Sequence, residues 1–268
     1  MSPVINFVCT VWFGITGSIT ALVLVILIVF FDLLRRGRIL RSSVSHGCVR
    51  VSTSSLYGVL MTINPQFRFV EARSSLPFEA IKPGAIILLN HSSKFDIFYS
   101  SLCPRSLVWK ATGVYKAALG SIPVLGAVFR SAGHFPVFFS SVDPEKFAVE
   151  KDKQASVNEA LEAFLASREG HVIFCPEGMV NPTPKTLRTF RKGMFEMCLK
   201  HNVPIYAIVH TGGYDAWPVA SLLGGLPATI RWRFVDVAVE YGKFTDGADL
   251  AQYVQSVMQG HVTELISI

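Results

Sequence analysis

Residues 11–31 form an uninterrupted apolar run with no ionisable side chain, and this run constrains the chain more than any other feature. It reads VWFGITGSITALVLVILIVFF, close to the roughly 20 apolar residues that a helix needs to cross a bilayer. No basic segment precedes it and no small-residue cleavage site ends it, so an anchor is favoured over a removed signal peptide. A buried core helix is the alternative, and the arginines directly after the run argue against it.

Basic residues begin abruptly behind this run, at Arg35, Arg36, Arg38, Arg41 and Arg50. Because cytoplasmic flanks of membrane helices are rich in arginine and lysine, the positive-inside rule predicts a cytosolic location for the rest of the chain. The net charge is +6, yet only 16% of residues are charged, against about a quarter in a typical soluble domain. No motif interleaves aromatic and basic residues, so we expect anionic lipid or phosphorylated substrates as partners rather than nucleic acid.

Strand-like and helical patterns alternate along the remainder, which is typical of an α/β sheet. We expect strands at 66–71, 85–90, 107–109, 171–175, 203–209 and 230–239, and helices at 95–103, 143–170, 187–201 and 250–265. The second of these helices has Asp143 as its N-cap, Pro144 in its first turn and Gly170 at its end. The predicted organisation is a transmembrane anchor with a basic link over residues 1–50, then a single α/β domain with a mixed sheet over residues 51–268.

Two apolar stretches and the cysteines remain outside that scheme. The stretches 111–132 and 216–228 are broken by glycine and proline, and each either packs in the core or meets the bilayer or an acyl chain. The five cysteines include no Cys-x-x-Cys pair, so neither a zinc site nor a disulfide framework is expected.

Candidate catalytic residues follow the apolar strand at 85–90, in the segment NHSSKFD that spans residues 90–96. A continuous helix would leave His91 and Asp96 about 140° apart, whereas a strand–turn–helix brings them together. Asp96 would then accept the N–H of one ring nitrogen of His91, and the other nitrogen would serve as a general base. The same spacing recurs at His210 and Asp215, so spacing alone does not choose between the two pairs.

The segment around His91 closely resembles the first motif of the glycerolipid acyltransferase family, which includes the 1-acylglycerol-3-phosphate acyltransferases. Four further stretches resemble later blocks of that family in the same order, at 123–133, 175–178, 190–195 and 203–208. They read PVLGAVFRSAG, CPEG, FRKGMF and VPIYAI, and the set extends over about residues 85–210. His210 and Asp215 lie at and beyond the end of the last block, so we interpret them as structural.

The resemblance implies transfer of an acyl group from acyl-CoA to the free hydroxyl of a lysophospholipid, with 1-acylglycerol-3-phosphate to phosphatidic acid as the first expectation. It implies that His91 is the base and Asp96 its partner, and that Glu177 and Gly178 help to hold the acceptor. We place Asn90 and Ser93 in the same substrate site. Acyl-CoA is expected as a co-substrate, and neither a metal nor a cofactor is expected.

Three positions depart from the family's pattern: Phe139 and Val180 stand where it usually has arginine, and Ala207 where it usually has proline. An acceptor phosphate would then need other cations, and the candidates are Arg130, Lys185, Arg188, Arg191 and Lys192. A remodelling acyltransferase or transacylase with another headgroup, and a catalytically silent lipid-binding protein, are the alternatives. The cytosolic domain and the resemblance together suggest the endoplasmic reticulum as the membrane.

Overall fold

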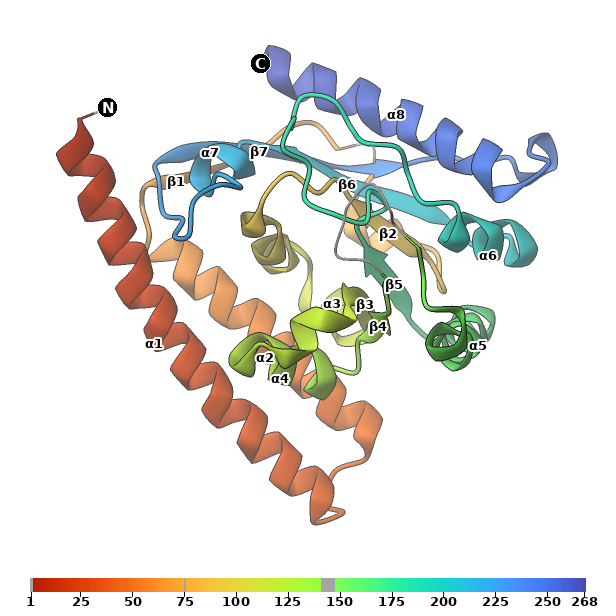
Figure 1. The fold of residues 1–268 in the computed structure, drawn as a ribbon, viewed down its shortest axis with the longest axis horizontal. Helices are drawn as coiled ribbons and strands as arrows, with labels where there is room; N and C mark the ends of the chain where they lie inside the picture. The colour runs from red at the N-terminus through yellow and green to blue at the C-terminus, as the bar shows by residue number, and fades with distance from the viewer. Residues whose placement is uncertain (1, 75, 141–147) are drawn as a thin grey trace.

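A single sheet of seven strands forms the centre of the computed structural model, which describes residues 2–74, 76–140 and 148–268. The strands are β1 (Phe67–Glu71), β2 (Ile86–Leu89), β3 (Ala111–Lys116), β4 (Phe135–Val137), β5 (His171–Phe174), β6 (Ile205–Thr211) and β7 (Ala228–Asp236). They lie in the order β1-β7-β6-β2-β5-β3-β4 (Figure 1). Among these strands only β6 and β7 pair in antiparallel fashion. The predicted mixed α/β sheet is confirmed.

Helices cover both faces of this sheet. They are α1 (Pro3–Arg36), α2 (Ser42–Thr62), α3 (Arg105–Lys110), α4 (Pro123–Ser131), α5 (Lys151–Ser167), α6 (Gly193–His201), α7 (Gly213–Ala216) and α8 (Gly247–Ser267). Short 3₁₀ segments are η1 (Phe78–Ala80), η2 (Lys94–Leu102), η3 (Ala117–Ser121) and η4 (Tyr241–Lys243). Because side chains alternate along a strand, Ile86 and Leu88 join the core under α5, α6 and α8, whereas Ile87 and Leu89 join the core under α2, α3 and α7.

The predicted apolar helix is confirmed as α1, but it does not stand apart from the domain. Trp12 Nε1 donates to the carbonyl of Ile63 at 2.8 Å. Further along α1, Leu24 is buried in a cluster with Val49 of α2. Figure 1 shows α1 and α2 as two long helices joined by a short turn, with α2 between α1 and the rest of the domain. Helix α2 also runs across the boundary predicted between residues 50 and 51.

Three sequence predictions need correction or fall outside the described residues. Residues 107–109 lie in α3 rather than in a strand, since their buried side chains pack on the α2 side of the sheet. The helix predicted at 187–201 begins only at Gly193, because the backbone N–H groups of residues 188 and 191 are used by the loop after β5. The helix predicted over 143–170 begins only at Lys151, because Val149 makes a β-bridge to Phe139 and Glu150 is extended; Asp143, Pro144 and Glu145 themselves lie outside the described residues.

Candidate active site

Three parallel strands bring the predicted site together. Strand β2 lies between β5 and β6, and all three run in the same direction. Their carboxyl ends therefore meet at one edge of the sheet, which is where ligands bind in open α/β folds. His91 follows β2, Glu177 follows β5, and His210 lies near the end of β6. The sheet thus joins residues that lie far apart in the sequence.

His91 and Asp96 make the contact that their spacing predicts. Asp96 Oδ2 accepts the Ser93 N–H at 2.9 Å, which closes the turn at the start of η2. The same oxygen lies 2.8 Å from His91 Nδ1. Because a carboxylate only accepts hydrogen bonds, Nδ1 carries the proton and Nε2 keeps the lone pair that a general base needs. The side chain of His91 is 25% exposed and that of Asp96 only 3%, so the histidine can meet a substrate while its partner is shielded.

Glu177 supports the backbone of His91. Its carboxylate, in a residue that is 1% exposed, accepts the N–H of His91 at 2.7 Å and the N–H of Arg188 at 2.9 Å. The N–H of Asn181 donates to the carbonyl of His91 at 2.6 Å. Gly178 lies in the turn between Glu177 and Asn181, and its φ of +74° falls where glycine is favoured. Burial raises the pKa of Glu177, and its two backbone hydrogen bonds offset part of that rise.

Like Glu177, the side chains of Asn90 and Ser93 bind backbone groups around the site. The amide of Asn90 exchanges two hydrogen bonds with the backbone of His210, at 3.0 and 2.9 Å, and the residue is 1% exposed. Ser93 is fully buried, and its Oγ donates to the carbonyl of Trp217 at 2.6 Å. The hydrogen bonds of these three residues hold the backbone around His91 in place, and their substrate-binding role stays a prediction.

His210 lies beside Asp96 and not beside Asp215. Its fully buried ring stacks on Tyr99 with 3.8 Å between the ring centroids, and its Nε2 lies 3.9 Å from Asp96 Oδ1. Asp215 is exposed on α7. Burial lowers the pKa of His210, which the nearby charge of Asp96 partly offsets. His210 thus joins His91 and Asp96 without Asp215, and only the tertiary structure reveals it.

A cluster of buried polar atoms adjoins Asp96 on this side. Several buried side-chain atoms without a hydrogen-bond partner in the described chain collect there: Ser92 Oγ, Asp96 Oδ1, Tyr99 OH and both ring nitrogens of His210. A Cβ atom on Gly213 would lie 3.2 Å from Tyr99 OH and 3.3 Å from Asp96 Oδ1. A side chain at position 213 would therefore crowd these polar atoms.

A family model described as Acyltransferase matches residues 68–211, more than half of the chain. The chain belongs to this acyltransferase family. The matched region contains His91, Asp96, Glu177 and His210. The resemblance that the ordered motifs indicated is thereby confirmed.

Individual relatives agree with this assignment. The 1-acyl-sn-glycerol-3-phosphate acyltransferase of Limnanthes alba is 27% identical over 164 residues, or 61% of this chain and 50% of that protein. That of Cocos nucifera is 30% identical over 150 residues, or 55% of this chain and 44% of that protein. The chain thus spans about half the length of the curated relatives it matches.

A solved structure shares the fold. The crystal structure of the 1-acyl-sn-glycerophosphate (LPA) acyltransferase PlsC from Thermotoga maritima matches with a TM-score of 0.70. The match covers 100% of this chain and 99% of that chain, at 18% sequence identity. The helices at the N-terminus are therefore included in the shared architecture.

Two of the predicted basic residues lie beside the site of this acyltransferase-family chain. The N–H of Arg188 binds Glu177, and the N–H of Arg191 donates to the carbonyl of Pro176 at 2.8 Å. Burial lowers the pKa of Arg191, and the positive charge of Arg188 lowers it further. Lys192 instead faces Glu196, at 3.9 Å. Arg188 and Arg191 are the stronger candidates for an anionic substrate.

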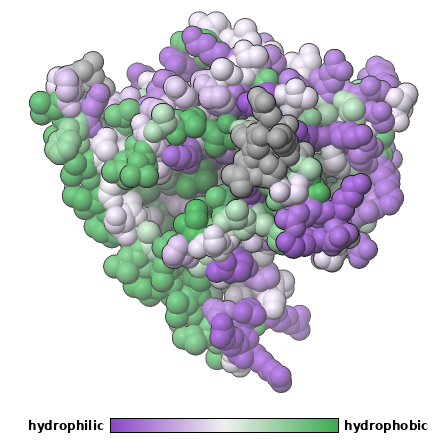
Figure 2. Space-filling model, in the orientation of Figure 1, coloured by the Kyte–Doolittle hydropathy of each residue, from purple (hydrophilic) through white to green (hydrophobic). Residues whose placement is uncertain are grey.

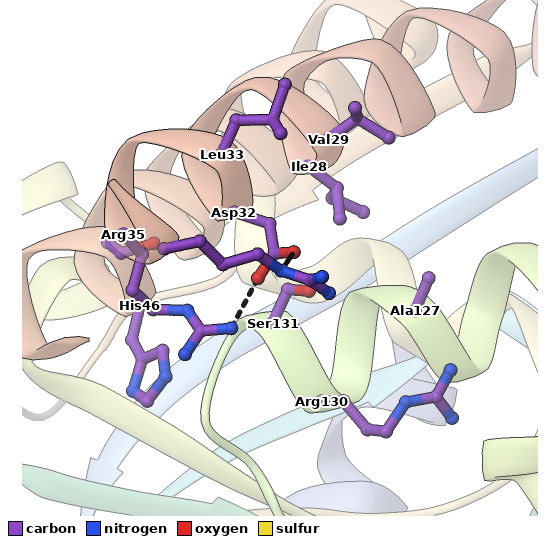
Figure 3. A pocket seen from close by; sticks show the side chains of 11 residues that line it. Ile28, Val29, Asp32, Leu33, Arg35, His46, Ala127, Arg130 and Ser131 are labelled. Carbon is purple, nitrogen blue, oxygen red and sulfur yellow. Dashed lines mark hydrogen bonds and ion pairs between the residues drawn. The ribbon is translucent and has the colours of Figure 1, made fainter. Parts of the chain in front are cut away.

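Arg130 lies in a different place. It lines a cavity of about 660 Å³ between α1, α2 and α4, together with Asp32, Arg35 and His46 (Figure 3). Asp32 binds both Arg35 and Arg36 there. The guanidinium of Arg130 donates to the carbonyl of Gly120 in η3. Neither contact involves Arg188 or Arg191, and the substrate-binding role of Arg130 stays a prediction.

One basic residue that the sequence did not single out lies close to Phe139. Lys116, at the end of β3, has its Nζ 6.0 Å from the centre of the Phe139 ring. Phe139 is the position where the family usually has arginine. Lys116 thus supplies a positive charge close to that position, and no spacing rule would have connected the two residues.

Proposed function

We propose that this protein transfers an acyl group from acyl-CoA to the free hydroxyl of a lysophospholipid, with 1-acylglycerol-3-phosphate as the first acceptor to test. The contact between His91 Nδ1 and Asp96 Oδ2, at 2.8 Å, carries this proposal. It gives a partly exposed histidine a fixed tautomer and a free second nitrogen. Membership of the acyltransferase family supports the reaction type.

The chemistry needs only a base and an activated thioester. His91 Nε2 takes the proton of the acceptor hydroxyl as its oxygen attacks the thioester carbonyl. Asp96 stabilises the imidazolium that forms, since its carboxylate faces the protonated Nδ1. The tetrahedral intermediate then collapses, the carbon–sulfur bond breaks, and the CoA thiolate receives the proton from His91. The new ester and free CoA leave.

Arg188 and Arg191 are proposed to bind the phosphate of the acceptor. They lie on the loop that Glu177 and Pro176 tie to the site, and planar guanidinium groups match phosphate oxygens well. Replacing both by alanine should raise the acceptor KM about tenfold or more, since a charge-assisted hydrogen bond contributes about 1.5–3 kcal/mol. Lys192→Ala is the matched control, because Glu196 already faces that ammonium group.

A panel of lysophospholipids with labelled acyl-CoA tests the reaction, using wild type and His91→Ala. Acylation of lysophosphatidate by the wild type alone would support both the substrate and the base. Preference for another headgroup would favour the remodelling alternative, for which Val180 in place of the family's usual arginine is the motivating feature. No transfer to any acceptor would refute the enzymatic proposal and leave a lipid-binding protein.

We further propose that α1 attaches the protein to one leaflet of a membrane. The exposed apolar residues of α1 recur every three or four positions, as a stripe along one side of a helix does. They include Phe7, Val11, Ile15, Ile19, Leu22, Ile26, Val29 and Leu33. A few residues on the opposite side of α1, among them Leu24, pack on the domain, so the proposed attachment uses the exposed side. In Figure 2 an apolar surface follows α1 and gives way to hydrophilic side chains at its lower end.

A glycosylation acceptor added before residue 1 tests this attachment in microsomes. If α1 spans the endoplasmic reticulum membrane with its basic end in the cytosol, the added asparagine reaches the lumen and is modified. If α1 stays in one leaflet with the domain, the added site remains unmodified. Fractionation of the tagged full chain would test the endoplasmic reticulum as its compartment.

A further inference from the structure

The loop between α7 and β7 is closed at its base and held against α1. The N–H groups of Gly225 and Leu226 both donate to the carbonyl of Ala216, at 3.0 and 3.1 Å, so the two ends of the loop meet. The Trp217 ring lies edge-on to Phe13 of α1, with 5.9 Å between the centroids. Figure 1 shows this loop beside the N-terminal half of α1.

Glycine lets the loop approach α1 this closely. Gly225 has φ of +103°, and a Cβ there would lie 2.6 Å from the Cβ of Phe13. A Cβ on Gly224 would lie 2.5 Å from the ring of Trp217. Side chains at either position would push the loop away from the helix.

The same loop touches the catalytic turn at two points. Ser93 Oγ donates to the carbonyl of Trp217 at 2.6 Å, and Lys94 Nζ donates to the carbonyl of Ser221 at 2.9 Å. Trp217 Nε1 also donates to the Ser221 carbonyl at 3.3 Å, which links the two contacts. Ser93 and Lys94 lie between His91 and Asp96, so the loop and the catalytic pair form one connected unit.

The tip of this loop presents two large apolar side chains to solvent. Leu222 is 86% exposed and Leu223 is 58% exposed, which is unusual for adjacent leucines on a folded surface. The helix that the loop packs on carries the apolar stripe already assigned to the membrane, including Val8 and Val11 on the same N-terminal half. The loop that carries the leucines thus packs on the helix that carries the apolar stripe.

We propose that Leu222 and Leu223 insert into the acyl-chain region of the bilayer as a second membrane contact, next to the catalytic turn. This inference rests on the membrane attachment of α1 proposed above. Through Trp217 and Ser221, the inserted loop holds the turn of His91 and Asp96 at the membrane surface. A lysophospholipid would then present its hydroxyl to His91 without leaving the lipid phase.

Quenching by lipids brominated along their acyl chains tests this insertion on the full chain in phospholipid vesicles. The variant Leu222→Trp adds one tryptophan whose emission is obtained by difference from the parent protein. Ile19→Trp reports on α1, and Ile266→Trp, on the exposed side of α8, is the matched control. We expect strong quenching at 222 and 19 and none at 266.

The possible results distinguish this inference from the proposals on which it rests. Quenching at 19 but not at 222 would overturn the insertion of the loop and leave the attachment of α1 intact. Absence of quenching at both positions would overturn both. Acyl transfer in detergent micelles is measured separately, so a failure of the enzymatic proposal would appear there alone.

Affinity for vesicles gives a second measure. The double variant Leu222→Asn/Leu223→Asn should bind vesicles about tenfold more weakly, because each buried leucine contributes strongly to transfer out of water. The control is Ile266→Asn/Ile268→Asn, which removes two exposed apolar side chains at the C-terminus. Equal vesicle binding by the two double variants would contradict the insertion.

Discussion

Replacing Glu177 by glutamine separates the support of His91 from the binding of an acceptor. The carboxylate accepts two backbone N–H groups, and an amide has only one oxygen to offer them. The NH₂ group of the glutamine would therefore face the N–H of either His91 or Arg188. One charge-assisted hydrogen bond is lost and one buried donor is left unpaired, at a cost of about 1.5–3 kcal/mol. That corresponds to a fall in Tm of roughly 3–10 °C.

The effect on catalysis should appear in kcat. Since the N–H of His91 is held directly by Glu177, loss of that bond lets the base move, and a 1 Å displacement costs about a hundredfold in rate. The acceptor KM should change little, because the carboxylate is shielded from substrate.

Steady-state kinetics and thermal unfolding in detergent, with Glu196→Gln as the control, measure both effects. Glu196 is exposed, so the same substitution there should change the free energy of unfolding by less than about 0.5 kcal/mol. If Glu177→Gln raises the acceptor KM tenfold and leaves kcat and Tm unchanged, our assignment is wrong and the residue binds the acceptor.

Three further substitutions test the site and its surroundings. Asp96→Asn keeps an oxygen for the Ser93 N–H but removes the charge facing His91, so kcat should fall about 10²–10⁴-fold with Tm nearly unchanged. An unchanged kcat would refute the role of Asp96 as the partner of His91. Gly213→Ala should lower kcat about tenfold by crowding Asp96, whereas Gly242→Ala, which meets open space, should not. Burial holds the pKa of His134 at about 3, and its Nδ1 accepts the Gly113 N–H at 2.8 Å. In the unfolded chain this histidine takes up a proton below about pH 6.5, so the free energy of unfolding of the wild type should fall by about 1.4 kcal/mol per pH unit below that value. The free energy of unfolding of His134→Gln should fall less. Equal slopes of unfolding free energy against pH for the two proteins, between about pH 7 and 5, would contradict this.

Several features of this protein could be predicted from local sequence. The apolar run of α1 is long enough to be recognised from hydropathy alone as a helix that could cross a membrane. Strand β2 is an unbroken apolar segment, and the polar residues directly after it indicate a strand that ends at a functional edge. Asp96 lies near His91 because one short turn joins them, and the capping pattern of Ser93 fixes that turn. Predictions of this kind depend on contacts between residues that are close in the chain.

The remaining features depend on contacts across the sheet. Leucine, valine and tryptophan at 107–109 suit a strand and a short helix equally well, and packing on α2 decided for the helix. The motifs indicated that Glu177 matters, but only the meeting of β2 and β5 shows that it binds the backbone of His91. His210 comes beside Asp96 because β6 pairs with β2, although the sequence offered Asp215 as its partner.

For the proposed membrane attachment too, the sequence determined one part and the tertiary structure another. The sequence by itself determined that α1 is a long apolar helix followed by arginines, since both properties reside in consecutive residues. Only the tertiary structure showed that one side of this helix packs on α2 and on the loop at Trp217. Hydropathy counts apolar side chains but does not record what each one contacts. Which residues of α1 remain exposed was therefore decided by the packing.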